Sequence, residues 1–130
     1  MNEFTGAVPI LNVKNLAASI EYYVNKLGFE KKWEWPSFAA VGRGKVEIFL
    51  CQGGQGRPGM WVSIFMEDAM PLYDEYKKSG AIIKEPPMNF PWGMCEFLVE
   101  DLDGHIFRMG GERTGPDSED CENTARSRPT

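Results

Sequence analysis

Histidine and cysteine are scarce in this chain. Its 130 residues include one histidine, His105, and three cysteines that do not have the spacing of metal-binding pairs. Acidic residues outnumber lysine and arginine, and the net charge of −5 disfavours nucleic acid as a partner but weakly attracts cationic small molecules. No apolar run approaches the roughly 20 residues that span a membrane, and the N-terminal sequence does not have the pattern of a secretion signal. We therefore expect a cytoplasmic protein with no membrane partner.

The order of the predicted elements indicates a tandem duplication within one α+β domain. Each half reads as a β-α-β-β-β unit, and the two halves repeat at a period of roughly 50 residues. The first half has a strand at 7–13, a helix that Asn15 caps and Gly28 ends, and strands at 30–35, 38–41 and 45–51. The second half has a strand at 60–66, a helix that ends at Gly80, and strands at 82–85, 94–100 and 105–109. A glycine-rich linker at 53–59 joins the halves.

Two further features complete the expected organisation. The first helix carries apolar residues three or four positions apart, which predicts a buried face made of Leu16, Ile20, Tyr23, Val24 and Leu27. Residues 112–130 contain almost nothing apolar and cannot offset the entropy of ordering. The predicted boundaries are therefore a folded domain at 1–111 and a flexible polar tail at 112–130.

Four short segments carry a family resemblance: 8–16 (VPILNVKNL), 27–29 (LGF), 91–97 (PWGMCEF) and 101–105 (DLDGH). Together with the duplicated unit, they resemble the vicinal oxygen chelate superfamily, which includes glyoxalase I and extradiol dioxygenases. The Pro-Trp-Gly segment and the Asp-x-Asp-Gly turn are most similar to those of bleomycin resistance proteins. The resemblance covers about residues 7–110 and implies a cupped mixed sheet. It also implies a homodimer in which the N-terminal strand is exchanged between protomers.

Enzymes of this superfamily bind a divalent metal through one side chain on each of four strands. The matching positions here are Val8, Glu47, Trp61 and Arg108, of which only Glu47 offers a suitable donor, because the guanidinium of Arg108 would repel a cation. The resemblance thus implies a protein with no metal and no cofactor. We expect Glu47 and Arg108 to form an ion pair in place of the metal, although each could instead meet another group near the rim.

Aromatic residues carry the functional prediction. In bleomycin resistance proteins two rings hold the planar part of the drug across the dimer interface, and the matching residues here are Trp92 and Phe38. Trp33, Trp35 and Trp61 add ring surface nearby, although core packing is the favoured interpretation of Trp33 and Trp61. The full set of expected ligand-binding residues is Phe38, Trp92, Trp35, Trp61, Glu47, Cys51 and Arg108.

Two residues with reactive side chains are given structural interpretations. Cys51 lies in a strand-like run, where a small core residue is more usual than a nucleophile. His105 follows the Asp-Gly turn, and we expect it to be an exposed residue at the end of the turn rather than a ligand or a general base. No catalytic residue is therefore predicted.

The sequence favours a metal-free homodimeric binding protein that sequesters a planar, cationic antibiotic such as bleomycin. One alternative is a metal-dependent lyase, isomerase or dioxygenase of the same superfamily. Another is a small interaction domain whose aromatic residues fill their own cup. Lys31 and Lys32 stand where several bleomycin resistance proteins carry carboxylates, so the sequence leaves the identity of the ligand open.

Overall fold

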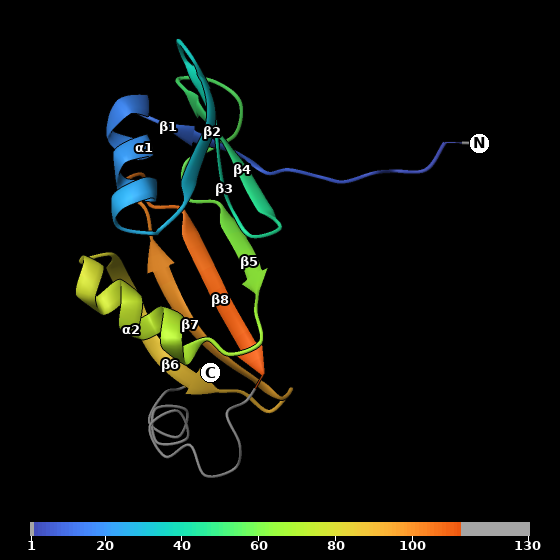
Figure 1. Ribbon diagram of the computed structural model, residues 1–130, viewed down its shortest axis with the longest axis vertical. Coiled ribbons are helices and arrows are strands. Elements are labelled where there is room, and N and C mark those ends of the chain that lie inside the picture. The colour runs from blue at the N-terminus through green and yellow to red at the C-terminus, as the bar shows by residue number, and fades with distance from the viewer. Residues whose placement is uncertain (1, 113–130) are drawn as a thin grey trace. The chain divides into compact units, whose positions relative to one another are not determined.

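Residues 2–112 are described by the computed structural model, which divides the chain into two compact units (Figure 1). Unit 1 ends at Pro58 and unit 2 begins at Gly59. Each unit holds one helix and four strands in the order β-α-β-β-β, and its strands form their own mixed sheet. The predicted α+β duplication is confirmed.

Unit 1 has a sheet of order β1-β4-β3-β2. Its elements are β1 (Ile10–Val13), α1 (Leu16–Asn25), β2 (Glu30–Trp35), β3 (Phe38–Arg43) and β4 (Val46–Gln52). β1 is parallel to β4, the other pairs are antiparallel, and α1 packs on β2, β3 and β4. As predicted, the Asn15 side chain caps α1, since its Oδ1 accepts a hydrogen bond from the Ala18 backbone N–H at 3.0 Å.

Unit 2 repeats this arrangement with the sheet order β5-β8-β7-β6. Its elements are β5 (Trp61–Phe65), α2 (Met70–Ser79), β6 (Ile82–Asn89), β7 (Met94–Glu100) and β8 (Ile106–Glu112). β5 is parallel to β8, and the β6–β7 and β7–β8 pairs are antiparallel. Gly80 ends α2 in the left-handed conformation, with φ of 86°, as its position in the sequence predicts.

The boundary predicted between domain and tail falls on a strand. Glu112, the first residue of the predicted tail, is the last residue of β8, and its backbone N–H donates to the Glu67 carbonyl at 2.9 Å. The remaining tail positions, 113–130, lie outside the described residues.

The buried face of α1 differs from the predicted one. Leu16, Tyr23 and Leu27 are buried as expected, but Val24 is exposed. Ser19 and Tyr22 are buried. A small serine lets the helix lie close to the sheet, and a tyrosine can bury its ring while its hydroxyl finds a polar partner. Apolar spacing alone therefore placed this helix at a slightly wrong rotation.

The two faces of the unit 2 sheet have different roles. Phe97 of β7 meets the rings of Tyr73 and Tyr76 from α2, with centroids 5.4 and 6.2 Å away, so it lies on the face that the helix covers. Side chains alternate along a strand, so Glu96 and Leu98 lie on the opposite face. That face carries the candidate site.

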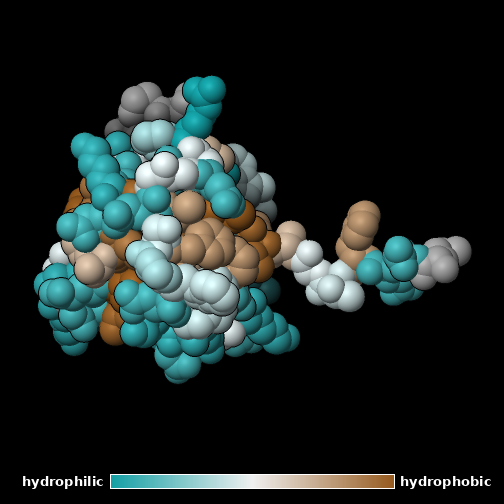
Figure 2. Space-filling model, turned by 90° about the horizontal axis from the view of Figure 1, so that it is seen from above, coloured by the Kyte–Doolittle hydropathy of each residue, from teal (hydrophilic) through white to brown (hydrophobic). Residues whose placement is uncertain are grey.

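Residues 2–7, ahead of β1, are exposed and extend outward (Figure 1 and Figure 2), and Phe4 among them is fully exposed. Within residues 2–112, neither helix combines the length and the apolar character that crossing a membrane requires.

Candidate ligand-binding pocket

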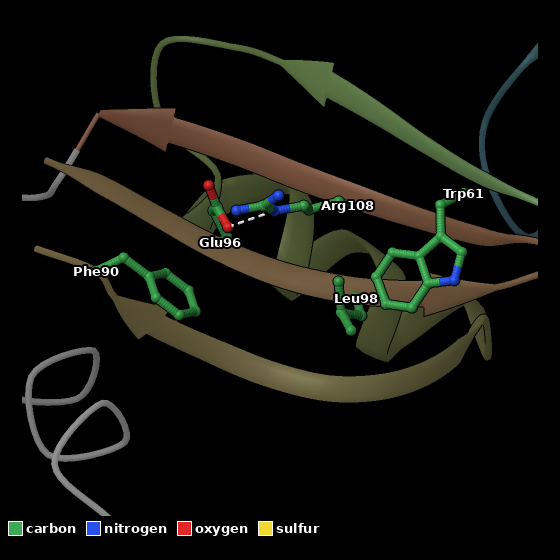
Figure 3. A pocket seen from close by; sticks show the side chains of 5 residues that line it. All are labelled: Trp61, Phe90, Glu96, Leu98 and Arg108. Carbon is green, nitrogen blue, oxygen red and sulfur yellow. Dashed lines mark hydrogen bonds and ion pairs between the residues drawn. The ribbon is translucent and has the colours of Figure 1, made fainter. Parts of the chain in front are cut away.

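A pocket of about 210 Å³ lies on the face of the unit 2 sheet that α2 leaves uncovered. Its lining residues come from β5, β7, β8 and the turn after β6, and are Trp61, Phe90, Glu96, Leu98 and Arg108 (Figure 3). The antiparallel register places Leu98 opposite Arg108, so Glu96 is a diagonal neighbour of the guanidinium. The result is an apolar pocket with one pair of opposite charges.

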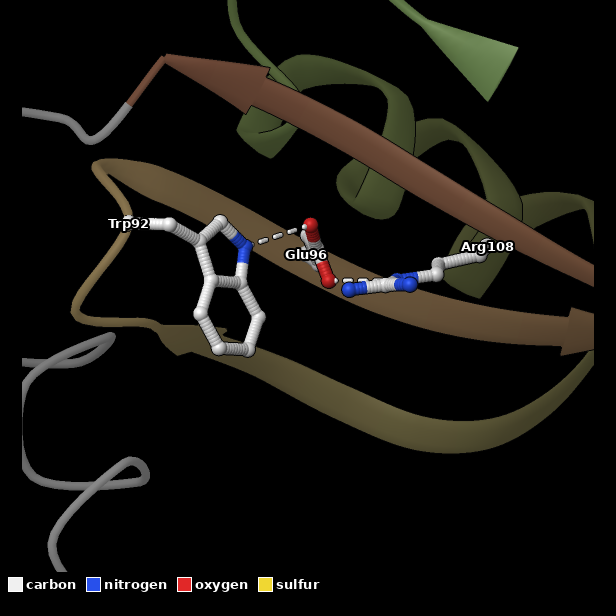
Figure 4. A network of polar contacts seen from close by, with 3 residues as sticks. All are labelled: Trp92, Glu96 and Arg108. Atoms are coloured by element: carbon white, nitrogen blue, oxygen red, sulfur yellow. Dashed lines mark hydrogen bonds and ion pairs between the residues drawn. The ribbon is translucent and has the colours of Figure 1, made fainter. Parts of the chain in front are cut away.

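Glu96 connects Arg108 to Trp92 (Figure 4). Its Oε1 accepts from Arg108 Nε at 2.7 Å, and its Oε2 accepts from Trp92 Nε1 at 3.2 Å. The glutamate side chain is only 7% exposed, whereas that of Arg108 is 40% exposed. A buried carboxylate with two donors holds both partners in place, and charge-assisted bonds of this kind are stronger than neutral ones.

Trp92 and Phe90 form a parallel aromatic stack. Their ring centroids are 4.6 Å apart with an interplanar angle of 10°. The turn between β6 and β7 fixes this arrangement, because the Phe90 N–H donates to the Met94 carbonyl at 2.8 Å and Gly93 adopts a φ of 88°. Trp92 remains 57% exposed. Arg108 Cζ lies 5.7 Å from the centroid of the Trp92 ring, within the range of a cation–π contact.

Unit 1 carries a second group of aromatic rings. Trp33, Phe38 and Phe49 lie in mutual contact, with centroids 5.2 to 5.6 Å apart. Trp35 follows two residues after Trp33 on β2 and is exposed. Cys51, a buried free thiol, lies opposite Phe38 in the register of β3 and β4.

The predicted site residues fall into two sets. Unit 2 brings together Trp61, Trp92 and Arg108 around the pocket. The others, Trp35, Phe38, Glu47 and Cys51, belong to unit 1. The predicted stacking pair of Trp92 with Phe38 and the predicted ion pair of Glu47 with Arg108 each take one residue from unit 1 and one from unit 2. Both stay predictions. The carboxylate partner that unit 2 itself gives Arg108 is Glu96.

Two structural interpretations of single residues were wrong. Trp61 is 59% exposed and lines the pocket, so it is not a core residue. His105 is fully buried rather than exposed, and its Nδ1 accepts a hydrogen bond from the Met60 backbone N–H at 3.1 Å. The backbone N–H of His105 donates to Asp101 Oδ1 at 2.9 Å. His105 therefore connects the turn before β8 to the start of β5.

Phe90, Glu96 and Leu98 line the pocket but were not among the predicted site residues. The sequence did contain a signal for two of them. In a hairpin, the turn at 101–104 sets which residues of the flanking strands face each other, and Leu98 and Glu96 follow by alternation once Arg108 is assigned. Phe90 precedes the Pro-Trp-Gly segment directly but has no pattern of its own.

The chemistry of the described residues does not resemble that of a metal site. Within residues 2–112, no group of three or more histidine, cysteine, aspartate or glutamate side chains lies close enough together to hold an ion. At the pocket, Glu96 is the one carboxylate in the lining, and an arginine and a tryptophan already occupy its two oxygens. What the pocket offers is ring surface and hydrogen-bond donors.

Comparison with known proteins identifies a family that the chain matches. Residues 4–109 match the model of the glyoxalase/bleomycin resistance protein/dioxygenase superfamily. The bleomycin-binding protein of bleomycin-producing Streptomyces verticillus, solved with copper(II)-bleomycin, shares 25% identity and a TM-score of 0.73 over 87% of this chain and 100% of its own.

Two further solved structures share the fold at lower identity. TioX from Micromonospora sp. ML1 is 20% identical over 83% of this chain and 100% of its own, with a TM-score of 0.73. The bleomycin resistance determinant encoded on the transposon Tn5 is 18% identical over 85% and 99%, also with a TM-score of 0.73. Among curated proteins, none matches this chain in sequence.

Proposed function

This chain belongs to the glyoxalase/bleomycin resistance protein/dioxygenase superfamily, and on that premise we propose that it is a homodimeric protein that sequesters a planar, cationic antibiotic such as bleomycin. Sequestration makes and breaks no bond in the ligand, so protection is stoichiometric. In this proposal the protein binds its ligand without a resident metal or cofactor.

The observation that carries this proposal is the aromatic wall of the pocket. Trp61 lines the pocket while more than half exposed, and the Phe90–Trp92 stack presents a second flat surface beside it. Large exposed rings around a concavity are typical of a binding surface rather than of a core. Each stacked ring pair contributes roughly 0.5–1.5 kcal/mol beyond the burial of its area, so several rings together favour a planar ligand.

The size of the pocket supports a ligand that reaches beyond unit 2. Sites for drug-sized ligands commonly enclose roughly 300–1,000 Å³, whereas this pocket has about 210 Å³. An antibiotic as large as bleomycin therefore needs additional surface. We propose that the aromatic rings of unit 1, Phe38 and Trp35 in particular, supply that surface across a dimer interface. The projecting N-terminal segment is suited to the strand exchange that such a dimer would use.

Two other properties agree with this ligand class. The net charge of −5 attracts a cationic molecule at long range. The Streptomyces protein with 25% identity is a bleomycin-binding protein.

The metal-dependent alternative requires different residues. Of the four positions that match the metal ligands of the superfamily, Val8, Trp61 and Arg108 offer no suitable donor. We expect elemental analysis of the purified protein to find no stoichiometric divalent metal. A tightly bound ion in every chain, together with an activity that is lost on chelation, would contradict the proposal.

The test of the proposed function is a titration with bleomycin. The chain has four tryptophans, so we would follow fluorescence in the wild type and in Trp92→Ala. We expect saturable binding that Trp92→Ala weakens by roughly 1–3 kcal/mol. The unfolding free energy should fall only modestly, by about 1 kcal/mol, because Trp92 is 57% exposed and Glu96 loses one donor but keeps its bond to Arg108.

Two controls separate binding from folding. Leu102→Ala removes an exposed apolar side chain from a turn and should change neither binding nor stability. Leu27→Ala empties a fully buried position and should destabilise the protein by roughly 2–5 kcal/mol. If bleomycin and other planar antibiotics leave the fluorescence unchanged, and Trp92→Ala unfolds much more easily than the wild type, the ring is structural and the proposed function is wrong.

A further inference from the structure

Arg108 reaches the pocket with unused hydrogen-bond donors. Its Nε donates to Glu96, and its guanidinium carbon lies near the Trp92 ring. Within residues 2–112, its two terminal nitrogens, Nη1 and Nη2, donate to no protein acceptor. The side chain lines the pocket and is 40% exposed. A planar fork of donors is therefore fixed at one edge while its outer atoms remain accessible to a ligand.

Glu96 is poorly placed to receive a cation. Its side chain is 7% exposed, and each of its oxygens already accepts a hydrogen bond from a side chain. A cationic group entering the pocket would have to displace Arg108 or Trp92 and would also meet the positive charge of Arg108. The charged atoms that a ligand can reach here are donors.

The dimensions of the pocket define which part of a ligand can enter. A cavity of roughly 150 Å³ holds benzene, and this pocket of about 210 Å³ has Trp61 and Phe90 in its lining. One ring or two fused rings therefore fit. Figure 3 shows Arg108 between the two rings, so an acceptor on the edge of an inserted ring system would meet the guanidinium.

We propose that the pocket of unit 2 selects a planar aromatic group that carries a carboxylate or carbonyl acceptor, and that the Nη atoms of Arg108 determine this specificity. The inference rests on the proposed function, because it names the part of the sequestered ligand that enters this pocket. A cationic group elsewhere in the same ligand would remain outside. Glu96 acts as a positioning residue that orients the guanidinium.

Three naphthalene compounds with the same ring system provide the test. 2-Naphthoate and 2-naphthamide carry acceptors, whereas 2-(aminomethyl)naphthalene carries a cation. Isothermal titration calorimetry would measure their affinities, and the indole N–H signal of Trp92 in NMR spectra would report binding at the pocket. We expect both acceptor compounds to bind about tenfold more tightly than the amine. A hydrogen bond to the guanidinium favours binding whereas a cation beside it is repelled, and this difference in binding free energy corresponds to at least a tenfold difference in affinity.

Variants assign the preference to the guanidinium fork. Arg108→Met should abolish the preference for the acceptor compounds and should raise the affinity for the amine, because Glu96 loses its counter-ion. Arg108→Lys keeps a charge near Glu96 but loses the fork, and should reduce the preference for 2-naphthamide. Arg57→Met removes an exposed arginine that is not among the pocket residues and serves as the matched control; the preference should survive it.

The outcomes distinguish this inference from the proposed function. If all three compounds shift the Trp92 signal with equal affinity, or the amine binds best, the acceptor specificity is wrong although the aromatic pocket stands. A preference that persists in Arg108→Met would also overturn the role of Arg108. If none of the compounds binds and bleomycin also fails to bind, the proposed function is wrong, and the inference fails with it.

Discussion

Glu96 and Arg108 differ in exposure, and this difference determines what each contributes. The carboxylate is buried, so it depends on its partners for the hydrogen bonds that water would otherwise supply. The guanidinium is partly solvated and can tolerate the loss of one acceptor. Removing Arg108 should therefore cost more stability than the modest value of an exposed ion pair would suggest.

A double-mutant cycle tests this coupling. Arg108→Met alone leaves a buried carboxylate without its counter-ion, and Glu96→Gln alone leaves the guanidinium without a charged acceptor. We expect the double variant to be more stable than additivity predicts, by about 1 kcal/mol, because neither uncompensated charge remains. Denaturant unfolding of the four proteins measures it. Strictly additive effects would show that the two side chains are not energetically coupled.

The same experiment with Glu47→Gln addresses the ion pair that the sequence predicts between Glu47 and Arg108. Coupling between these two residues would support a contact between the units. Additive effects would contradict the predicted pair of Glu47 and Arg108, and Glu96 would be the carboxylate that pairs with Arg108.

At the scale of secondary structure elements, β8 shows how adjacent glycines can have different roles. A Cβ at Gly111 would lie 2.6 Å from the Ala69 backbone nitrogen and 3.0 Å from Asp68 Cα. A Cβ at Gly110 would instead meet side-chain atoms, 3.2 Å from Met94 Cε and 3.3 Å from Glu96 Cγ. Backbone atoms cannot move aside as side chains do, so the two positions should respond differently to the same substitution.

We expect Gly111→Ala to destabilise the protein by about 2–3 kcal/mol, in the upper part of the range for overpacking. Gly110→Ala should cost less, about 1 kcal/mol, because the flexible end of Met94 can move and Glu96, although held by Arg108 and Trp92, has to give by only a few tenths of an ångström. Thermal unfolding of both variants measures the difference. Equal losses would mean that the segment before α2 adapts to the added methyl group.

The elements also show how far the sequence alone could predict this fold. The order of strands and helices was predictable because the apolar periodicity is strong and some ends are marked, by Asn15 and Gly80 for example. Some strand ends differ by several residues, since β1 begins at Ile10 rather than at 7 and β6 runs to Asn89 rather than to 85. The end of β8 was not, because glycines usually weaken a strand, and here Gly111 allows a close backbone contact that no local pattern reveals. The charged pair at the pocket likewise depends on the register between β7 and β8, which is a property of two strands together.

At the scale of the whole molecule, β5 is an edge element that needs a partner. It lies at the edge of its sheet, and its alternate residues Trp61 and Phe65 are 59% and 73% exposed. An edge strand with large exposed apolar side chains is prone to self-association unless another chain or element covers it. A second copy of this chain would cover it in the predicted homodimer, and would also extend the small pocket that Trp61 lines.

We therefore expect light scattering to show a dimer at micromolar concentration. Phe65→Lys places a charge on the exposed strand and should weaken the dimer, because burying an unpaired charge in an interface is costly. Leu102→Lys likewise replaces an exposed apolar side chain by lysine, at a turn residue, and should leave the dimer intact. Bleomycin affinity should fall with dimer content in Phe65→Lys if the partner completes the site. A wild-type protein that is monomeric at these concentrations would contradict the dimer. A monomer that still binds bleomycin tightly would show that unit 2 needs no partner chain to hold its ligand.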